Sequence, residues 1–282
     1  MNKLIDASSR TGSLLSAGLE PCEAYLPEGF EANLPGYERF LRTIIDATAG
    51  LVAAYKFNLA FFEALGPEGW NLLFRVRRAL PNDALVIADA KRGDIGTTAE
   101  HYARALYAEL NADSATVNPL MGRDSAEPFI AHADKLTFFL VLTSNPGASD
   151  FLIPGALYAT IARRVASWNT RGNCGAVVGA TQPGQVEEIR ALMPEVPFLI
   201  PGIGAQGGDL EAVAARGRVP IDAGADARSR AARLGLLFHV TRGLLPARGE
   251  SGDVGAMIRT RTREWNRRIA AAAEGRNAHV DR

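Results

Sequence analysis

The amino-acid sequence predicts an α/β fold of the (β/α)8-barrel class, a TIM barrel made of a single domain. Apolar runs typical of buried strands occur eight times along the chain, and helical patterns alternate with them. The chain has 282 residues and no linker or break in composition, a length that suits one such barrel. The expected strands are residues 14–19, 52–57, 84–88, 114–117, 137–142, 175–178, 197–200 and 236–240.

Amphipathic segments lie between the expected strands and predict the helices of the barrel. They are residues 37–49, 69–79, 97–110, 155–169 and 182–192, and a further helix at about 256–273 closes the chain. An open doubly wound sheet is the alternative, but no G-x-G-x-x-G sequence follows the first expected strand. We therefore expect one domain over residues 1–282, with a charged tail at 274–282 that frays. The Arg- and Ala-rich stretch 214–233 fits a helix with a solvated face, an extension before the last strand or a mobile segment.

Charge, cysteine content and the start of the sequence exclude several classes of protein. The 31 Lys and Arg residues cancel the 31 Asp and Glu residues, so we expect no nucleic-acid partner. Residues 1–10 lack the apolar core of a signal peptide, and no apolar run approaches the length that spans a membrane. Cys22 and Cys174 are too few for a disulfide framework. These features predict a cytoplasmic enzyme without a membrane partner.

The densest group of titratable residues follows the third expected strand. Asp89, Lys91 and Asp94 occur where parallel α/β folds place their chemistry, at the carboxyl end of a strand. Alternation along a strand directs Asp89 and Lys91 to the same side, whereas Asp94 can turn back or reach a neighbouring subunit. The simplest alternative is a surface turn with a solvated ion pair. The position after a strand favours a site that moves protons next to an anion.

The ends of the last two expected strands predict a phosphate site. Four glycines follow the seventh strand, and Arg242 follows the eighth, where barrels commonly bind phosphate. Glycines let backbone N–H groups approach phosphate oxygens, and an arginine adds a bidentate cation. The four histidines of the chain show no metal-ligand spacing, so no metal site is expected. We infer a substrate with phosphate at one end and reactive chemistry beside Asp89 and Lys91.

Four motifs together resemble the orotidine 5′-phosphate decarboxylase family, specifically its longer-chain bacterial (type 2) group. The motifs occupy residues 60–66, 89–98, 143–148 and 201–208, and the resemblance extends from about residue 14 to 247. The resemblance implies a homodimer of barrels with shared active sites that converts orotidine 5′-monophosphate to UMP and carbon dioxide. This is the last step of de novo pyrimidine nucleotide synthesis. The family uses no metal or organic cofactor, so none is expected here.

The same resemblance assigns catalytic roles. Lys91 would protonate C6 of the pyrimidine as carbon dioxide departs. Asp89 would face the substrate carboxylate, and the repulsion between the two anions would be relieved in the transition state. Asp94, with Ile95 and Thr98, would enter the active site of the neighbouring subunit.

The resemblance also assigns contacts to the rest of the substrate. Lys56 would hydrogen-bond the ribose and position Asp89, and Ser144 would contact the pyrimidine amide. Gln206 and Arg242 would bind the phosphate, with the loop that carries Gln206 closing over it.

Two positions depart from the family pattern. Glu20, expected to bind the ribose, stands where family members usually have aspartate, and its side chain is one methylene longer. Thr241 precedes Arg242 where serine is usual. We assign the phosphate to Arg242 because it directly follows an apolar run, and interpret three other arginines as solvated surface charges: Arg228, Arg230 and Arg233.

Two other functions remain as alternatives. Metal-dependent barrel enzymes that act on sugar phosphates share the D-x-K-x-x-D core, but the turn at residues 143–147 is better suited to a pyrimidine. A catalytically silent nucleotide-binding barrel is the other alternative, and both Glu20 and the altered segment before Arg242 favour it.

Overall fold

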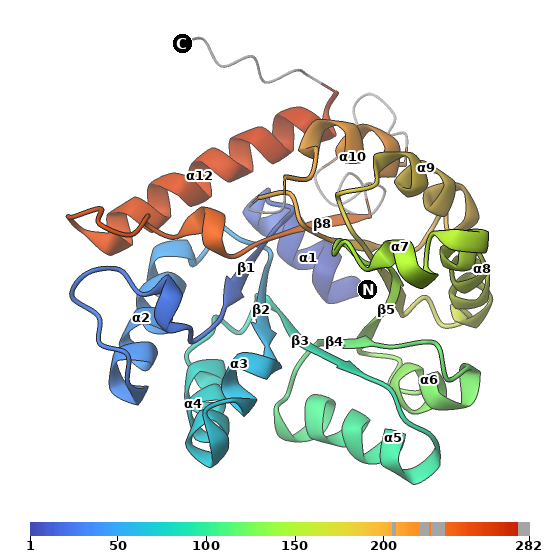
Figure 1. Cartoon of the computed structure of the whole chain (residues 1–282), viewed down its shortest axis with the longest axis horizontal. Helices are drawn as coiled ribbons and strands as arrows, with labels where there is room; N and C mark the ends of the chain where they lie inside the picture. The colour runs from blue at the N-terminus through green and yellow to red at the C-terminus, as the bar shows by residue number, and fades with distance from the viewer. Residues whose placement is uncertain (205–206, 220–225, 227–234, 276–282) are drawn as a thin grey trace.

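A computed structural model describes residues 1–204, 207–219, 226 and 235–275 of the chain (Figure 1). Its eight strands form a closed barrel in sequence order, with β1 and β8 paired in parallel. The predicted (β/α)8 fold is therefore confirmed. The strands are β1 (Leu15–Leu19), β2 (Ala54–Asn58), β3 (Leu85–Arg92), β4 (Ser114–Val117), β5 (Leu136–Leu142), β6 (Cys174–Val178), β7 (Phe198–Pro201) and β8 (Leu236–Val240).

Helices surround the barrel on the outside, and one of them lies across an end of it (Figure 1). They are α1 (Asn2–Thr11), α2 (Leu34–Thr48), α3 (Leu59–Glu63), α4 (Gly66–Arg78), α5 (Gly96–Arg104), α6 (Arg123–Ile130), α7 (Ala148–Phe151), α8 (Leu157–Trp168), α9 (Pro183–Leu192), α10 (Leu210–Gly217) and α12 (Val254–Ala273). Shorter turns occupy Glu23–Tyr25, Ala105–Glu109, Pro154–Ala156 and Arg242–Leu244. Helix α10 covers the start of the Arg-rich stretch, whereas Arg228, Arg230 and Arg233 lie outside the described residues, as does most of the charged tail.

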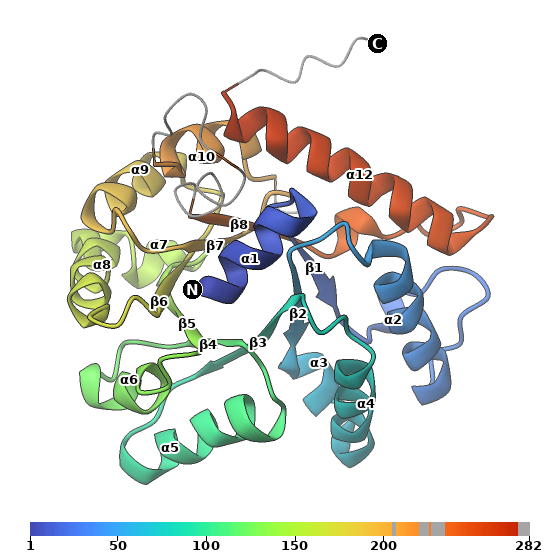
Figure 2. The same cartoon turned by 180° about the vertical axis from the view of Figure 1, so that it is seen from behind.

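The first helix closes the amino-terminal end of the barrel (Figure 2). Leu4 and Ala7 of α1 belong to the apolar cluster inside the barrel, together with Leu85, Leu136 and other residues of the strands. An ion pair of 2.6 Å between Lys3 Nζ and Asp113 Oδ2 holds α1 next to the start of β4. Because this end is filled with side chains, the carboxyl ends of the strands form the open end of the barrel. The sequence analysis expected no helix here.

A second, larger apolar cluster lies between the strands and the surrounding helices. One cation, Arg190 of α9, is buried at its edge, with its guanidinium 3.6 Å from the centre of the Phe198 ring. This guanidinium donates hydrogen bonds of 2.6–3.2 Å to the carbonyl oxygens of Met193, Val196, Gly217 and Gly235. Since Gly217 ends α10 and Gly235 precedes β8, Arg190 ties both to β7.

We predict that Arg190→Met lowers the free energy of unfolding by about 3 kcal/mol, because several buried carbonyl groups lose their donor. Urea unfolding followed by circular dichroism measures the change. Arg216→Met is the matched control, since Arg216 pairs with Glu187 at the surface and its loss should cost about 0.5 kcal/mol or less. Equal effects of the two substitutions would contradict the structural role of Arg190.

Candidate active site

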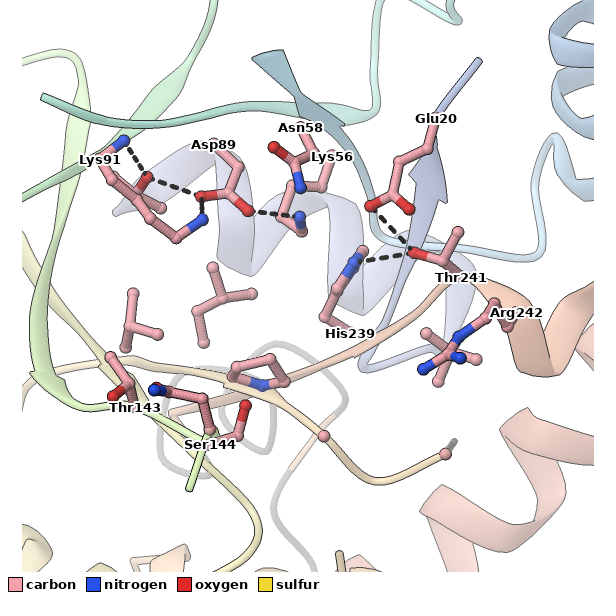
Figure 3. Close-up of a pocket in the computed structure, with 18 of the residues that line it drawn as sticks. Glu20, Lys56, Asn58, Asp89, Lys91, Thr143, Ser144, His239, Thr241 and Arg242 are labelled. Carbon is pink, nitrogen blue, oxygen red and sulfur yellow. Dashed lines mark hydrogen bonds and ion pairs between the residues drawn. The ribbon is translucent and has the colours of Figure 1, made fainter. Parts of the chain in front are cut away.

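A cavity of about 370 Å³ opens at the carboxyl ends of the strands (Figure 3). This volume is within the range of sites that bind small molecules. Both the strands and the turns that follow them supply its polar lining. The polar residues that line it include Glu20, Lys56, Asn58, Asp89, Lys91, Thr116, Thr143, Ser144, Asn145, His239, Thr241 and Arg242.

Asp89 lies between two lysines on one wall of this cavity (Figure 3). Lys56 Nζ is 2.6 Å from Asp89 Oδ2, and Lys91 Nζ is 2.6 Å from Asp89 Oδ1. Thr116 Oγ1 donates a third hydrogen bond of 2.9 Å to Oδ1. The side chain of Lys56 is 5% exposed and that of Lys91 is 50% exposed. One cation is thus fixed in the barrel, and the other is open to a ligand.

The two lysines keep Asp89 ionised. Burial alone would raise the pKa of this carboxyl group, but the ammonium groups of Lys56 and Lys91 outweigh burial and hold the pKa well below its usual range. The trio therefore carries two positive charges and one negative charge at neutral pH. An anionic ligand is attracted to the trio as a whole and repelled by Asp89 locally.

The backbone at Lys91 departs from extended geometry, which the sequence analysis did not predict. Lys91 has φ of 48°, in the left-handed region that disfavours side chains other than glycine. Its N–H donates to Thr116 Oγ1 at 2.9 Å, and the register between β3 and β4 shifts between Ala88 and Arg92. A strained residue of this kind costs of the order of 1 kcal/mol and often marks a functional site.

Glu20 is buried on the opposite side of Lys56 from Asp89 (Figure 3). Burial raises the pKa of this carboxyl group, and Asp89 adds to the rise, whereas Lys56 and a hydrogen bond from Thr241 lower it. Thr241 Oγ1 lies 3.4 Å from Glu20 Oε1. The two departures from the family pattern, Glu20 and Thr241, are therefore in contact with each other.

The cavity extends from these groups to the turns after β7 and β8. Arg242 is exposed at its edge, and Gly202 and Gly204 line it. A side chain at Gly208 would come within 2.6 Å of Gly202 O, so glycine is required for this close turn. Gln206, predicted to bind phosphate, lies outside the described residues.

Ser144, the predicted pyrimidine contact, lines the same cavity after β5. Its carbonyl accepts a hydrogen bond of 3.3 Å from Thr181 Oγ1. The backbone of Ser144 also packs so closely on Gly179 that a Cβ there would lie 2.6 Å from its nitrogen. The sequence analysis proposed no role for Asn58, Thr116 or His239 in the site. A lone histidine within an apolar run carries no signal that distinguishes a cavity residue from a core residue.

Asp94, Ile95 and Thr98 are not among the residues that line this cavity. Asp94 Oδ1 accepts a hydrogen bond of 2.8 Å from the Ile95 N–H. Ile95 is 54% exposed, and Thr98 is exposed on α5. In the structure of one chain, Ile95 and Thr98 are thus exposed and Asp94 is half-buried, all three outside the cavity.

The described residues contain neither a cluster of metal ligands nor a helix that could span a membrane. No three His, Cys, Asp or Glu side chains within the described ranges gather in a way that could hold a metal ion. Likewise, none of the helices in that part of the chain is both long and apolar enough to cross a membrane.

The depressed pKa of Asp89 predicts a pH-dependent contribution to stability. Unfolded Asp89 binds a proton more readily than folded Asp89, so its contribution is complete above about pH 5 and declines as the pH falls below about 4. Between pH 6 and pH 3, the parent protein should therefore lose more unfolding free energy than Asp89→Asn, with an extra slope of up to about 1.4 kcal/mol per pH unit. Urea unfolding at several pH values measures this difference, and Asp46→Asn, an exposed carboxylate on α2, is the control. Parallel curves for the parent and Asp89→Asn would contradict the prediction.

Comparison with known proteins places this chain in a family. The family model described as "Orotidine 5'-phosphate decarboxylase / HUMPS family" matches residues 14–229. A protein named orotidine 5′-phosphate decarboxylase from Dehalococcoides mccartyi is 46% identical to the chain, over 78% of this chain and 83% of its own length. Another protein of that name, from Roseiflexus castenholzii, is 43% identical over 94% of this chain and 95% of its own length. The structure of Leishmania donovani OMP decarboxylase aligns with a TM-score of 0.80 at 36% identity, covering 97% of this chain and 98% of that one. A wall of two lysines around an aspartate, a glycine-lined turn and an arginine at the opposite end thus occur in a chain that belongs to the orotidine 5′-phosphate decarboxylase family.

Proposed function

We propose that this chain decarboxylates orotidine 5′-monophosphate to UMP and carbon dioxide, the last step of de novo pyrimidine nucleotide synthesis. Membership of the family supports the activity. The observation that carries the mechanism is the Lys56–Asp89–Lys91 trio in a cavity whose far end is bordered by Arg242. Such a cavity suits a substrate with a reactive anion at one end and a phosphate at the other.

In the proposed reaction, the substrate carboxylate lies beside Asp89. The bond between C6 and the carboxylate carbon breaks, its electron pair remains on C6, and neutral carbon dioxide leaves. The ammonium of Lys91 stabilises the charge that develops on C6 and then transfers a proton to it, which forms the new C–H bond. Because the side chain of Lys91 is half exposed, solvent can return the proton after product release.

The phosphate supplies binding energy away from the reacting carbon. We assign it to Arg242 and to backbone N–H groups of the turn after β7, and Gln206 remains a predicted contact on that turn. Binding energy from this end can hold the substrate carboxylate against the repulsion of Asp89. Ser144, which lines the cavity after β5, is assigned to the pyrimidine ring.

We further propose that two copies of the chain form a dimer in which each contributes Asp94, Ile95 and Thr98 to the other's site. Their position outside the cavity of their own chain supports this arrangement. Three large apolar side chains are exposed, one within this segment and two in the turn after β4, and their burial would favour association. These side chains are Ile95, Leu120 and Met121.

The experiment that tests the activity is the ultraviolet absorbance of orotidine 5′-monophosphate mixed with the purified protein in the presence of a chelator. A fall in absorbance with formation of UMP would establish a decarboxylase that needs no chelatable metal. Activity that the chelator abolishes would favour a metal-dependent sugar-phosphate enzyme. Binding of UMP without turnover would favour a catalytically silent nucleotide-binding protein, and Glu20→Asp would then be the first variant to make.

We predict that Lys91→Ala lowers kcat by about 1000-fold or more, because it removes both the proton donor and the cation next to C6. The thermal unfolding midpoint should change little, since the side chain is half exposed. Lys3→Ala is the control, because it removes a lysine at the closed end of the barrel and should leave kcat unchanged. Substantial residual turnover in Lys91→Ala would exclude its role as the proton donor.

Mixing of inactive variants tests the shared site. Lys91→Ala and Asp94→Ala subunits, exchanged in equal amounts, should recover about a quarter of the parent activity, because half of the dimers then contain one intact site. Lys91→Ala mixed with the double variant Lys91→Ala/Asp94→Ala should recover none. No recovery in the first mixture, with subunit exchange demonstrated by a tagged copy, would show that Asp94 does not act across the dimer.

A further inference from the structure

A line of polar side chains runs from the interior of the barrel to Glu20. The Oγ atom of Ser16, on β1, lies 3.4 Å from His239 Nδ1. On the other side of the ring, His239 Nε2 lies 3.2 Å from Thr241 Oγ1. Thr241 Oγ1 continues the line to Glu20 Oε1 at 3.4 Å. Ser16, His239 and Glu20 are buried, and Figure 3 shows the last three members of the line next to one another. Nothing in the proposed reaction uses His239.

The hydroxyl of Thr241 defines the direction of the hydrogen bonds between His239 and Glu20. Thr241 has one hydroxyl hydrogen and donates it to the Glu20 carboxylate, so its oxygen must accept from His239. The Nε2 atom of His239 therefore carries hydrogen. Burial and the nearby charge of Lys56 keep the pKa of His239 well below its usual value, so the ring is neutral. The donors at His239 Nε2 and Thr241 Oγ1 thus both point toward Glu20.

We propose that His239 is a positioning residue that, through Thr241, aims the Glu20 carboxylate into the cavity at the hydroxyl groups of the substrate's sugar. This inference rests on the proposed function. Glutamate has one more rotatable bond than aspartate, and ordering it costs conformational entropy. A hydroxyl whose lone pair is occupied by His239 can offer its hydrogen only to the carboxylate, and this limits the orientations that Glu20 adopts.

Strand β1, which pairs with β8, leaves room for this arrangement. A Cβ at Gly18 of β1 would overlap the hydroxyl of Thr241, so glycine at this position lets Thr241 approach Glu20. Lys56, the buried lysine, lies between the Asp89 end and the Glu20 end of the cavity (Figure 3). The carboxylate of Glu20 therefore borders the part of the cavity between the reacting end and Arg242, where a sugar between base and phosphate would lie.

The test compares the binding of UMP with that of 2′,3′-dideoxyuridine 5′-monophosphate, which lacks both sugar hydroxyls, by calorimetry. His239→Leu and Thr241→Val should each weaken UMP by about tenfold, the usual effect of one hydrogen bond, and weaken the dideoxy compound less than about twofold. His239→Gln and Thr241→Ser keep a donor near the original atom and should keep most of the preference for UMP. With substrate, the first pair should raise KM more than it lowers kcat, because a contact to the sugar is present both before and during reaction.

The outcomes separate the inference from the proposed function. The positioning role would be overturned if a variant lost the same affinity for both nucleotides while the parent still converted substrate. It would also be overturned if His239→Leu and His239→Gln bound UMP equally well. A parent protein that neither converts substrate nor prefers UMP would overturn the proposed function instead. If His239→Leu fails to fold because its side chain is buried, the comparison of Thr241→Val with Thr241→Ser decides the question alone, since Thr241 is only half-buried.

Discussion

The ion pair between Lys56 and Asp89 is the interaction on which the rest of the site depends. Both charges lie inside the barrel, where each would be unfavourable alone, and their contact at 2.6 Å makes the burial tolerable. Lys91 and Thr116 both donate hydrogen bonds to the other oxygen of the same carboxylate, Oδ1. A dense group of charges is therefore held on neighbouring strands, which are the most rigid part of the fold. The repulsion that Asp89 exerts on an anionic ligand is built in before the ligand arrives.

The two ends of the cavity are built in different ways. The reacting end is made of side chains on β2 and β3, whose paired register places Asn58 opposite Asp89. The other end is made of turns, with glycines where backbones approach closely and an arginine on a short helical turn after β8. Rigid strands suit groups that must be placed accurately around a reacting carbon, and turns suit groups that follow a phosphate as it enters and leaves.

Much of the fold could be predicted because parallel strands buried on both faces read as continuous apolar runs. The expected strands agree with the observed ones to within a few residues, with the main exception of β3, which continues through Arg92. Helix α1 was not predicted, because seven of its ten residues are polar and the other three, Leu4, Ile5 and Ala7, form no apolar run. Within the site, the spacing of Asp89 and Lys91 predicted their proximity, whereas Lys56 could be assigned only by resemblance. The positive φ at Lys91 and the contacts of His239 depend on tertiary structure and leave no local pattern in the sequence.

The closure of one end of the barrel by α1 limits where substrate can enter and where products can leave. Side chains such as Leu85 and Leu237 fill the interior beneath the cavity. The nucleotide and the gas released from it therefore share the opening at the carboxyl ends of the strands. In the proposed reaction, carbon dioxide forms beside Asp89 and Lys91 at the inner wall of the cavity and leaves through the same opening. A nucleotide that blocked this opening would therefore retain the gas as well.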